Sequence, residues 1–147
     1  MTNRHFRDLF FALSAAEVRY LIVGAYAVTF HARPRFTKDL DVWIEPTAAN
    51  AERVWRALAA FGAPVKDLER AELMNPELVF QIGLPPNRID ILTSIEGLEF
   101  AGAWSRRVEA KYDDCAVWYL GKGDLILSKR AMGRPQDLED VRVLEGK

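Results

Sequence analysis

The chain has 147 residues, which suits one domain, and 50% of them are hydrophobic, enough to bury a core. With 20 basic and 21 acidic residues the formal net charge is −1, so bulk charge favours neither a general nucleic-acid binder nor a membrane-surface protein. The single cysteine excludes an intramolecular disulfide and a cysteine-rich zinc site. We therefore expect one domain over residues 1–147 in the reducing cytoplasm.

The first apolar stretch of the chain is interpreted as a helix face. Between residues 6 and 13, apolar side chains recur at i, i+3, i+4 and i+7, which is typical of a helix packed on a core. The stretch is too short for a membrane span and ends at charged residues, unlike a secretion signal. We therefore expect no membrane association.

Periodicity and turn residues predict alternating helices and strands, with Gly62 and Gly133 ending helices and Pro135 starting one. In chain order the predicted elements are a helix over 3–16, a strand over 20–23, a helix over 25–30, a strand over 39–44, a helix capped by Thr47 and running to 61, strands over 78–82 and 88–92, a helix over 100–105, strands over 107–112 and 116–120, and helices over 124–132 and 135–144. This order predicts an α/β (α+β) fold, a mixed sheet with flanking helices.

Two aspartates lie two residues apart on the strand predicted over 39–44. Residues at i and i+2 of a strand point to the same face, so Asp39 and Asp41 converge while Leu40 and Val42 face the core. Neighbouring carboxylates repel each other unless a cation lies between them. Because oxygen ligands favour Mg²⁺, the pair indicates a metal site; the alternative is two solvated surface side chains.

Asp90 is the one acid in an otherwise apolar strand, 88–92. Burying an unpaired charge is costly, so Asp90 needs a partner. That partner is either the metal site of Asp39 and Asp41, or Arg88, which shares a strand face with Asp90 and could also serve the site. The sequence leaves both open.

A strand over 20–23 runs into Gly24 and then into a helix. Glycine lets a ligand approach the backbone closely, and the start of a helix offers N–H groups to phosphate. Many α/β turns share this pattern, but here the next strand carries Asp39 and Asp41. The combination predicts a phosphate cradle facing a metal site.

Gly24-Ala25, a gap of thirteen residues, Asp39-Leu40-Asp41-Val42 and the later Asp90 resemble the motif of the polymerase-β-type nucleotidyltransferase superfamily. The segment 129–141 is similar to the Lys…Arg-x-x-Asp-x-x-Asp ending of AbiEii-like toxin nucleotidyltransferases and of kanamycin- and lincosamide-type antibiotic nucleotidyltransferases. The resemblance spans residues 20–144 and implies a nucleotidyltransferase fold. Ala25 is its main departure, since the family usually has Gly or Ser there.

The resemblance implies a catalytic centre with two Mg²⁺ ions. Asp39, Asp41 and Asp90 would be the metal ligands, and Asp90 would also help to deprotonate the acceptor hydroxyl. Two such ions clamp the attacking and leaving oxygens of an in-line phosphoryl displacement.

The resemblance also implies a nucleotide-binding set. Gly24 and Ala25 would lie along the phosphates. Thr37, close to the aspartates in the sequence, could contact the phosphates or an acceptor; the alternative is a solvated loop. Lys129 would contact the triphosphate and offset the charge of the leaving group, which makes it catalytic as well. Asp137 would either orient Lys129 or simply suit the dipole at the start of its helix.

The implied reaction transfers NMP from an NTP to an acceptor hydroxyl, on RNA such as tRNA or on a small compound. We expect the toxin-like member of a two-gene module, with an antitoxin as partner protein. One alternative is an inactive nucleotidyltransferase-fold protein that works through binding or regulation, which Ala25 favours and the retained charged residues oppose. The other is an antibiotic-modifying nucleotidyltransferase, which differs only in its acceptor.

Other residues with reactive side chains are interpreted as structural. Cys115 lies in an apolar run and is expected in the core. His31 lies near the predicted site, but we expect it to support the fold. The four tryptophans form no base-stacking motif and are expected in the core or an interface.

Overall fold

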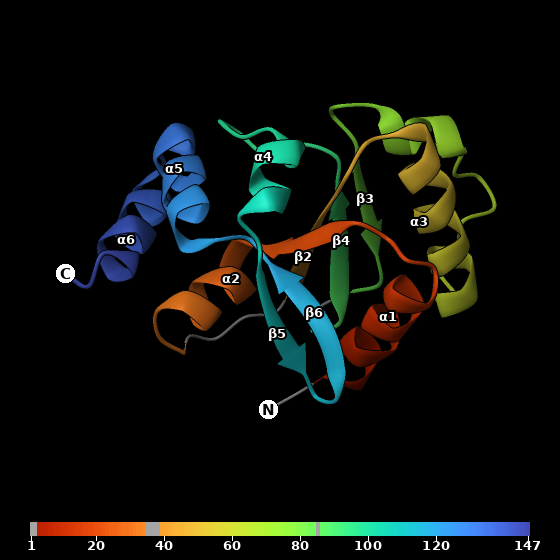
Figure 1. The fold of residues 1–147 in the computed structure, drawn as a ribbon, viewed down its shortest axis with the longest axis horizontal. Coiled ribbons are helices and arrows are strands. Elements are labelled where there is room, and N and C mark those ends of the chain that lie inside the picture. Colours follow the sequence, from red (N-terminus) through yellow and green to blue (C-terminus); the bar gives the residue numbers. More distant parts are fainter. Residues whose placement is uncertain (1–2, 35–38, 85) are drawn as a thin grey trace.

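The computed structural model describes residues 3–34, 39–84 and 86–147. Helices and strands alternate as far as residue 61; two pairs of strands separated by a helix and then a pair of helices follow, and together they build one sheet with helices around it (Figure 1). The helices are α1 (Arg4–Ala15), α2 (Gly24–His31), α3 (Ala48–Phe61), the short 3₁₀ helix η1 (Arg70–Met74), α4 (Phe100–Ser105), α5 (Lys122–Met132) and α6 (Pro135–Leu144). The strands are β1 (Tyr20–Val23), β2 (Asp39–Ile44), β3 (Val79–Ile82), β4 (Arg88–Leu92), β5 (Val108–Tyr112) and β6 (Cys115–Tyr119).

Each helix and strand that the sequence predicts is confirmed, with ends shifted by at most two residues. The start of α5 shows the largest shift. The helix begins at Lys122, after Gly121 as its cap, and the carboxylate of Asp124 in its first turn lies 2.9 Å from Nε of Arg106. The sequence analysis missed η1, which is too short for a periodic pattern and is held by reciprocal contacts between Glu69 and Glu72.

The sheet places the strand of Asp39 and Asp41 between two strands that also reach the predicted site. Among the described residues the strand order is β3-β4-β2-β1-β6-β5. β2 runs antiparallel to β1 and parallel to β4. In this register Asp41 lies opposite Val23, next to the Gly24 turn, and also opposite Asp90.

The two faces of the sheet are covered by different helices. Phe10 of α1 stacks on Tyr20 of β1, and Phe100 of α4 packs edge-on against Trp43 of β2. Tyr20 pairs with the residue after Trp43, so the two rings face opposite sides of the sheet. Asp41, two residues before Trp43, therefore faces the side that carries α4.

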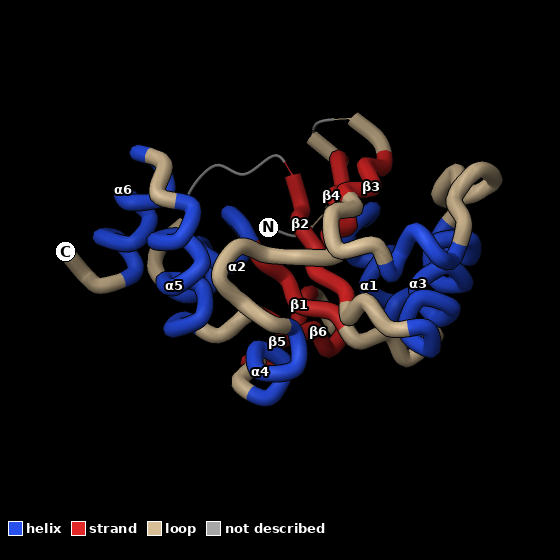
Figure 2. Tube along the Cα trace, turned by 90° about the horizontal axis from the view of Figure 1, so that it is seen from above, coloured by secondary structure: helices blue, strands red, loops and turns tan. Residues whose placement is uncertain are grey.

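The helices contribute to the core and form the two ends of the molecule. The apolar face predicted for residues 6–13 is buried in α1, and Oδ1 of Asn3 caps this helix by accepting N–H bonds from His5 and Phe6. In Figures 1 and 2, α1 and α3 lie together at one end and α5 and α6 at the other. No helix in the described ranges has the length and apolar character needed to cross a membrane.

Candidate active site

The turn between β1 and α2 requires glycine. Gly24 has a φ of 66°, which favours glycine, and a Cβ atom there would lie 2.3 Å from Oδ2 of Asp41. The close approach that the sequence predicted for a ligand is therefore made by a carboxylate of the same site. Ala25 follows, partly buried, in the first turn of α2.

We expect Gly24→Ala to destabilise the protein by about 1–3 kcal/mol, because it combines a strained backbone with a clash against Asp41. Gly62→Ala is the matched control: Gly62 also has a positive φ, of 97°, but a Cβ there would meet nothing within 4 Å in the described chain. Urea unfolding should show a larger loss for Gly24→Ala. Equal losses for the two variants would mean that the contact with Asp41 is unimportant.

The three predicted carboxylates lie at neighbouring positions on one face of the sheet. Asp39 and Asp41 are two residues apart on β2, and Asp90 on β4 is directly opposite Asp41. The same register places Arg88 opposite Asp39. Asp90 is buried, with 7% of its surface exposed, whereas Asp39 and Asp41 are partly buried.

Arg88 forms ion pairs with two of these carboxylates. Its Nη2 lies 2.9 Å from Oδ2 of Asp39, and its Nε lies 3.2 Å from Oδ1 of Asp90. The sequence left two possible partners for Asp90, the metal site and Arg88. The structure shows the ion pair with Arg88. Within residues 3–34, 39–84 and 86–147, no three His, Cys, Asp or Glu side chains are already arranged to hold a metal ion. Metal binding by Asp39, Asp41 and Asp90 stays a prediction.

Asp41 is the electrostatically strained member of the group. Burial raises the pKa of its carboxyl group to about 7, and the negative charges of Asp90 and Asp39 contribute, while the positive charges of Arg88 and Lys129 act in the opposite direction. Near neutral pH its charge is therefore poorly compensated. A cation bound beside Asp41 would relieve this strain.

Lys129 reaches the site from α5, but not as an exposed side chain. We expected its head group to be open to the cleft; this was wrong, since only 8% of the residue is exposed. Its Nζ lies 3.0 Å from Asp140 and 3.6 Å from Asp137, both buried on α6. A buried ammonium group is tolerated because these acids compensate its charge.

The partner assigned to Lys129 from sequence, Asp137, is shared with another cation. Nε of Arg134 lies 2.6 Å from Oδ2 of Asp137, and this bond is the main reason that the pKa of Asp137 is lowered. Asp140 makes the shorter contact with Lys129, and the sequence analysis missed it. The signal was available, because residues three apart share a helix face.

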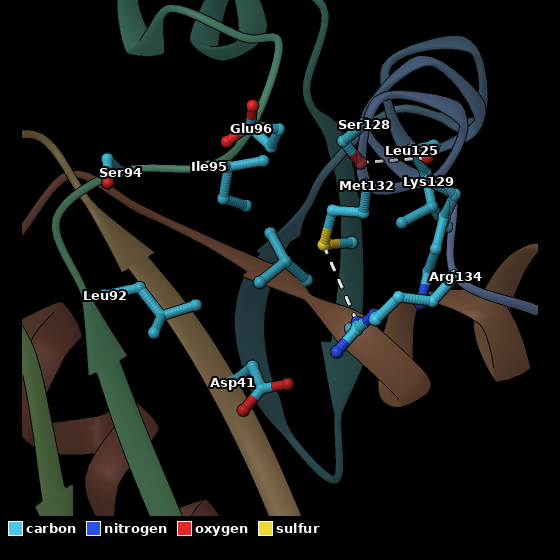
Figure 3. Close-up of a pocket in the computed structure, with 12 residues that line it drawn as sticks. Asp41, Leu92, Ser94, Ile95, Glu96, Leu125, Ser128, Lys129, Met132 and Arg134 are labelled. Atoms are coloured by element: carbon cyan, nitrogen blue, oxygen red, sulfur yellow. Dashed lines mark hydrogen bonds between the residues drawn. The ribbon is translucent and has the colours of Figure 1, made fainter. Parts of the chain in front are cut away.

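Three of these side chains, Asp41, Lys129 and Arg134, line one pocket with a volume of about 370 Å³. Its lining does not include the other charged side chains described above, namely Asp39, Arg88, Asp90, Asp137 and Asp140. Its polar end is formed by Gly24, Asp41, Lys129 and Arg134. Figure 3 shows Lys129 and Arg134 on the α5 side, with Asp41 across the opening on β2. The rest of the lining is mainly apolar, with three further polar residues. The apolar residues are Val23, Leu92, Ile95, Leu125 and Met132, and the polar ones are Ser94, Glu96 and Ser128.

The remaining predicted residues lie outside the pocket or outside the described chain. Thr37 belongs to the latter. Nε2 of His31 lies 2.6 Å from the carbonyl oxygen of Leu120, which supports its structural interpretation. Cys115 is buried, and burial raises the pKa of its thiol, as expected for an unreactive core cysteine.

The mixed sheet and its flanking helices define a nucleotidyltransferase fold, as the sequence resemblance implied. The chain belongs to the family described as "Nucleotidyltransferase of unknown function" (DUF6036), whose model matches residues 8–145. A comparison with curated proteins gave no match.

Two solved structures share this fold over nearly their whole length. The lincosamide antibiotic adenylyltransferase LnuA, solved with lincomycin bound, aligns with a TM-score of 0.63 at 15% identity, covering 99% of this chain and 97% of LnuA. A candidate nucleotidyltransferase from Thermotoga maritima aligns with a TM-score of 0.64 at 15% identity, covering 97% of this chain and 93% of that one. At this identity the likeness establishes the fold.

Proposed function

We propose that this protein is a Mg²⁺-dependent nucleotidyltransferase that transfers NMP from an NTP to an acceptor hydroxyl and releases pyrophosphate. The observation that supports this most is the polar end of the pocket, where the Gly24 turn, Asp41 and Lys129 meet. Asp41 lies on β2, Gly24 directly follows the adjacent strand β1, and Lys129 comes from α5, far away in the sequence. A purely structural role does not require a buried lysine and a strained carboxylate to share one pocket.

Three parts of the chain would interact with the phosphates of the nucleotide. The first turn of α2, beginning at Gly24, offers backbone N–H groups to phosphate oxygens. Lys129, held by Asp140 and Asp137, supplies a fixed positive charge where the pyrophosphate leaves. Arg134 at the rim adds a second charge to the same end, and the apolar walls suit a nucleobase.

The carboxylates fit a hard divalent cation. The pKa of Asp41 is raised first by burial and then by the negative charges of Asp90 and Asp39, and Oδ1 of Asp39 is buried with no hydrogen-bond partner in the described part of the chain. Asp39, Asp41 and Asp90 would hold Mg²⁺, two ions in our proposal, which would stabilise charge on the reacting phosphate and activate the acceptor hydroxyl. Asp90 would accept the hydroxyl proton.

The acceptor is the open part of the proposal. The toxin-like resemblance in segment 129–141 favours an RNA such as tRNA, with an antitoxin as regulator in the cytoplasm. A small antibiotic is the second candidate, because LnuA aligns with this chain over almost its full length and was solved with lincomycin. An inactive protein with this fold, working through binding, is the third.

A transfer assay separates these candidates. The protein is incubated with Mg²⁺, each α-³²P-labelled NTP and either tRNA or a set of hydroxylated antibiotics that includes lincomycin. Label on one acceptor class identifies the substrate. No label on any acceptor, together with a folded protein, would favour the inactive alternative.

Nucleotide binding gives a prediction that needs no acceptor. Mg²⁺ with a suitable NTP should raise the melting temperature by several degrees, because a ligand at about one hundred times its Kd stabilises the folded state by about 2.7 kcal/mol. Differential scanning fluorimetry with each of the common NTPs at millimolar concentration measures this. Mg²⁺ with sulfate is the control for ionic strength. No shift with any NTP would contradict the proposal.

A further inference from the structure

Arg88 occupies the carboxylate oxygens that a cation would need. It contacts Oδ2 of Asp39 at 2.9 Å and Oδ1 of Asp90 at 3.2 Å, and its Nη2 donates a hydrogen bond to Oδ2 of Asp90 at 3.3 Å. Three of the four carboxylate oxygens of Asp39 and Asp90 are therefore in contact with one guanidinium group. The fourth, Oδ1 of Asp39, is buried and lacks a hydrogen-bond partner among the described residues; Oδ1 of Asp90 also accepts no hydrogen bond there, so its contact with Arg88 is an ion pair only.

This arrangement is built by the strand register, not by a surface side chain that happens to lie nearby. Arg88 is directly opposite Asp39 on the neighbouring strand and two residues before Asp90, so all three project from one face. The Arg88 side chain is 32% exposed and the Asp90 side chain 10%, so the contacts are partly shielded from water. A planar guanidinium with several donors matches two carboxylates better than a single ammonium would.

We infer that Arg88 is a tethered counter-ion that competes with the divalent cation for Asp39 and Asp90. The inference rests on the proposed function. In the metal-free protein Arg88 neutralises both acids; when the metal binds, the same oxygens pass to the metal and Arg88 leaves them. Metal binding therefore includes the cost of breaking these ion pairs.

The competition makes metal binding depend on the nucleotide. Mg²⁺ is usually bound by one or two carboxylates together with substrate phosphates, since few proteins supply all of its ligands. A bare ion must displace Arg88 with protein ligands alone, whereas a metal that arrives with a triphosphate brings further oxygens. Metal should thus bind weakly alone and more tightly with the nucleotide.

The Arg88→Gln variant tests this through binding, independently of catalysis. Mn²⁺ is titrated into the protein by electron paramagnetic resonance, alone and with a non-hydrolysable ATP analogue. Without the analogue, Arg88→Gln should bind Mn²⁺ about tenfold more tightly than the wild type, and the gain from adding the analogue should shrink by a similar factor. Arg106→Gln is the matched control, because it breaks an arginine–aspartate contact with the buried Asp124, outside the pocket, and should bind Mn²⁺ like the wild type.

Two further measurements test the inference even if Arg88→Gln folds poorly. Arg88→Lys keeps the charge but lacks the planar fork, so its affinity for Mn²⁺ alone should lie between those of the wild type and Arg88→Gln. In the wild type, the NMR signal of the Arg88 Nε–H should move on adding Mg²⁺ and the analogue, because its ion pair with Asp90 breaks. An unmoved signal would overturn the inference.

The outcomes separate this inference from the proposed function. If the wild type binds Mn²⁺ with the analogue but Arg88→Gln gains no affinity, or loses it, Arg88 orients the carboxylates instead of competing for them, and only this inference falls. If the wild type binds no Mn²⁺ even with the analogue, both proposals fall.

Discussion

The Asp41→Asn variant should lose nucleotidyl transfer by about 100-fold or more and yet be more stable than the wild type at about pH 8 without metal. Asparagine keeps the size of the side chain but removes a charge that the proposed metal requires. In the absence of metal that charge destabilises the folded state, because burial disfavours it and Asp90 and Asp39 repel it. Activity and stability should therefore change in opposite directions.

The raised pKa of Asp41 determines how the stability of the protein should change with pH. In the folded state the pKa of Asp41 is raised to about 7, above its unfolded value of about 4. Its contribution to stability is thus fully present below about pH 4 and is lost as pH rises through about 7. Urea unfolding in EDTA should show the wild type losing on the order of 2 kcal/mol more than Asp41→Asn across this window.

The control for Asp41→Asn is Asp67→Asn, the same change at an exposed position. It should leave both transfer and the pH profile as in the wild type. An Asp41→Asn protein that unfolds more easily than the wild type at about pH 8 without metal would show that Asp41 is a structural hydrogen-bond or ion-pair partner.

The Lys129→Ala variant should lose both transfer and about 3 kcal/mol of stability. From sequence alone this substitution was expected to spare the fold. The structure changes the expectation, because removing the ammonium leaves Asp140 and Asp137 with less compensation in a buried position. Chemical denaturation should show the loss, with Lys122→Ala, an exposed lysine on the same helix, as the control.

A double variant separates the two effects of Lys129. Lys129→Met with Asp140→Asn removes one charge of each sign and retains packing and the acceptor for Gln136. It should recover most of the lost stability but none of the transfer. Transfer that returns with stability would show that Lys129 acts only through the fold.

The sequence was sufficient for every helix and strand except η1, and for two local features of the candidate site. Strand alternation placed Asp39 and Asp41 together, and glycine in a strand-to-helix turn marked Gly24. These signals are local, so they do not depend on how the strands pair. The contact between Gly24 and Asp41 follows only from the antiparallel register of β1 and β2.

The features of the site that could not be predicted from the sequence depend on contacts between distant parts of the chain. The parallel register of β2 and β4 brings Arg88 against Asp39, and no local pattern specifies it. The burial of Lys129 likewise depends on how α6 packs on α5. The motif in segment 129–141 contained Asp140, but only the packed helices show it nearer than Asp137 to Lys129.

The ion pair between Lys129 and Asp140 also bears on when the enzyme can first work during its synthesis. The carboxylates and the glycine turn all precede α5 in the chain, whereas the acids that hold Lys129 belong to α6. A nascent chain that has released the sheet but not α6 from the ribosome would have Lys129 unanchored. Translation itself would thus keep the proposed phosphate site incomplete until α6 has emerged and packed against α5.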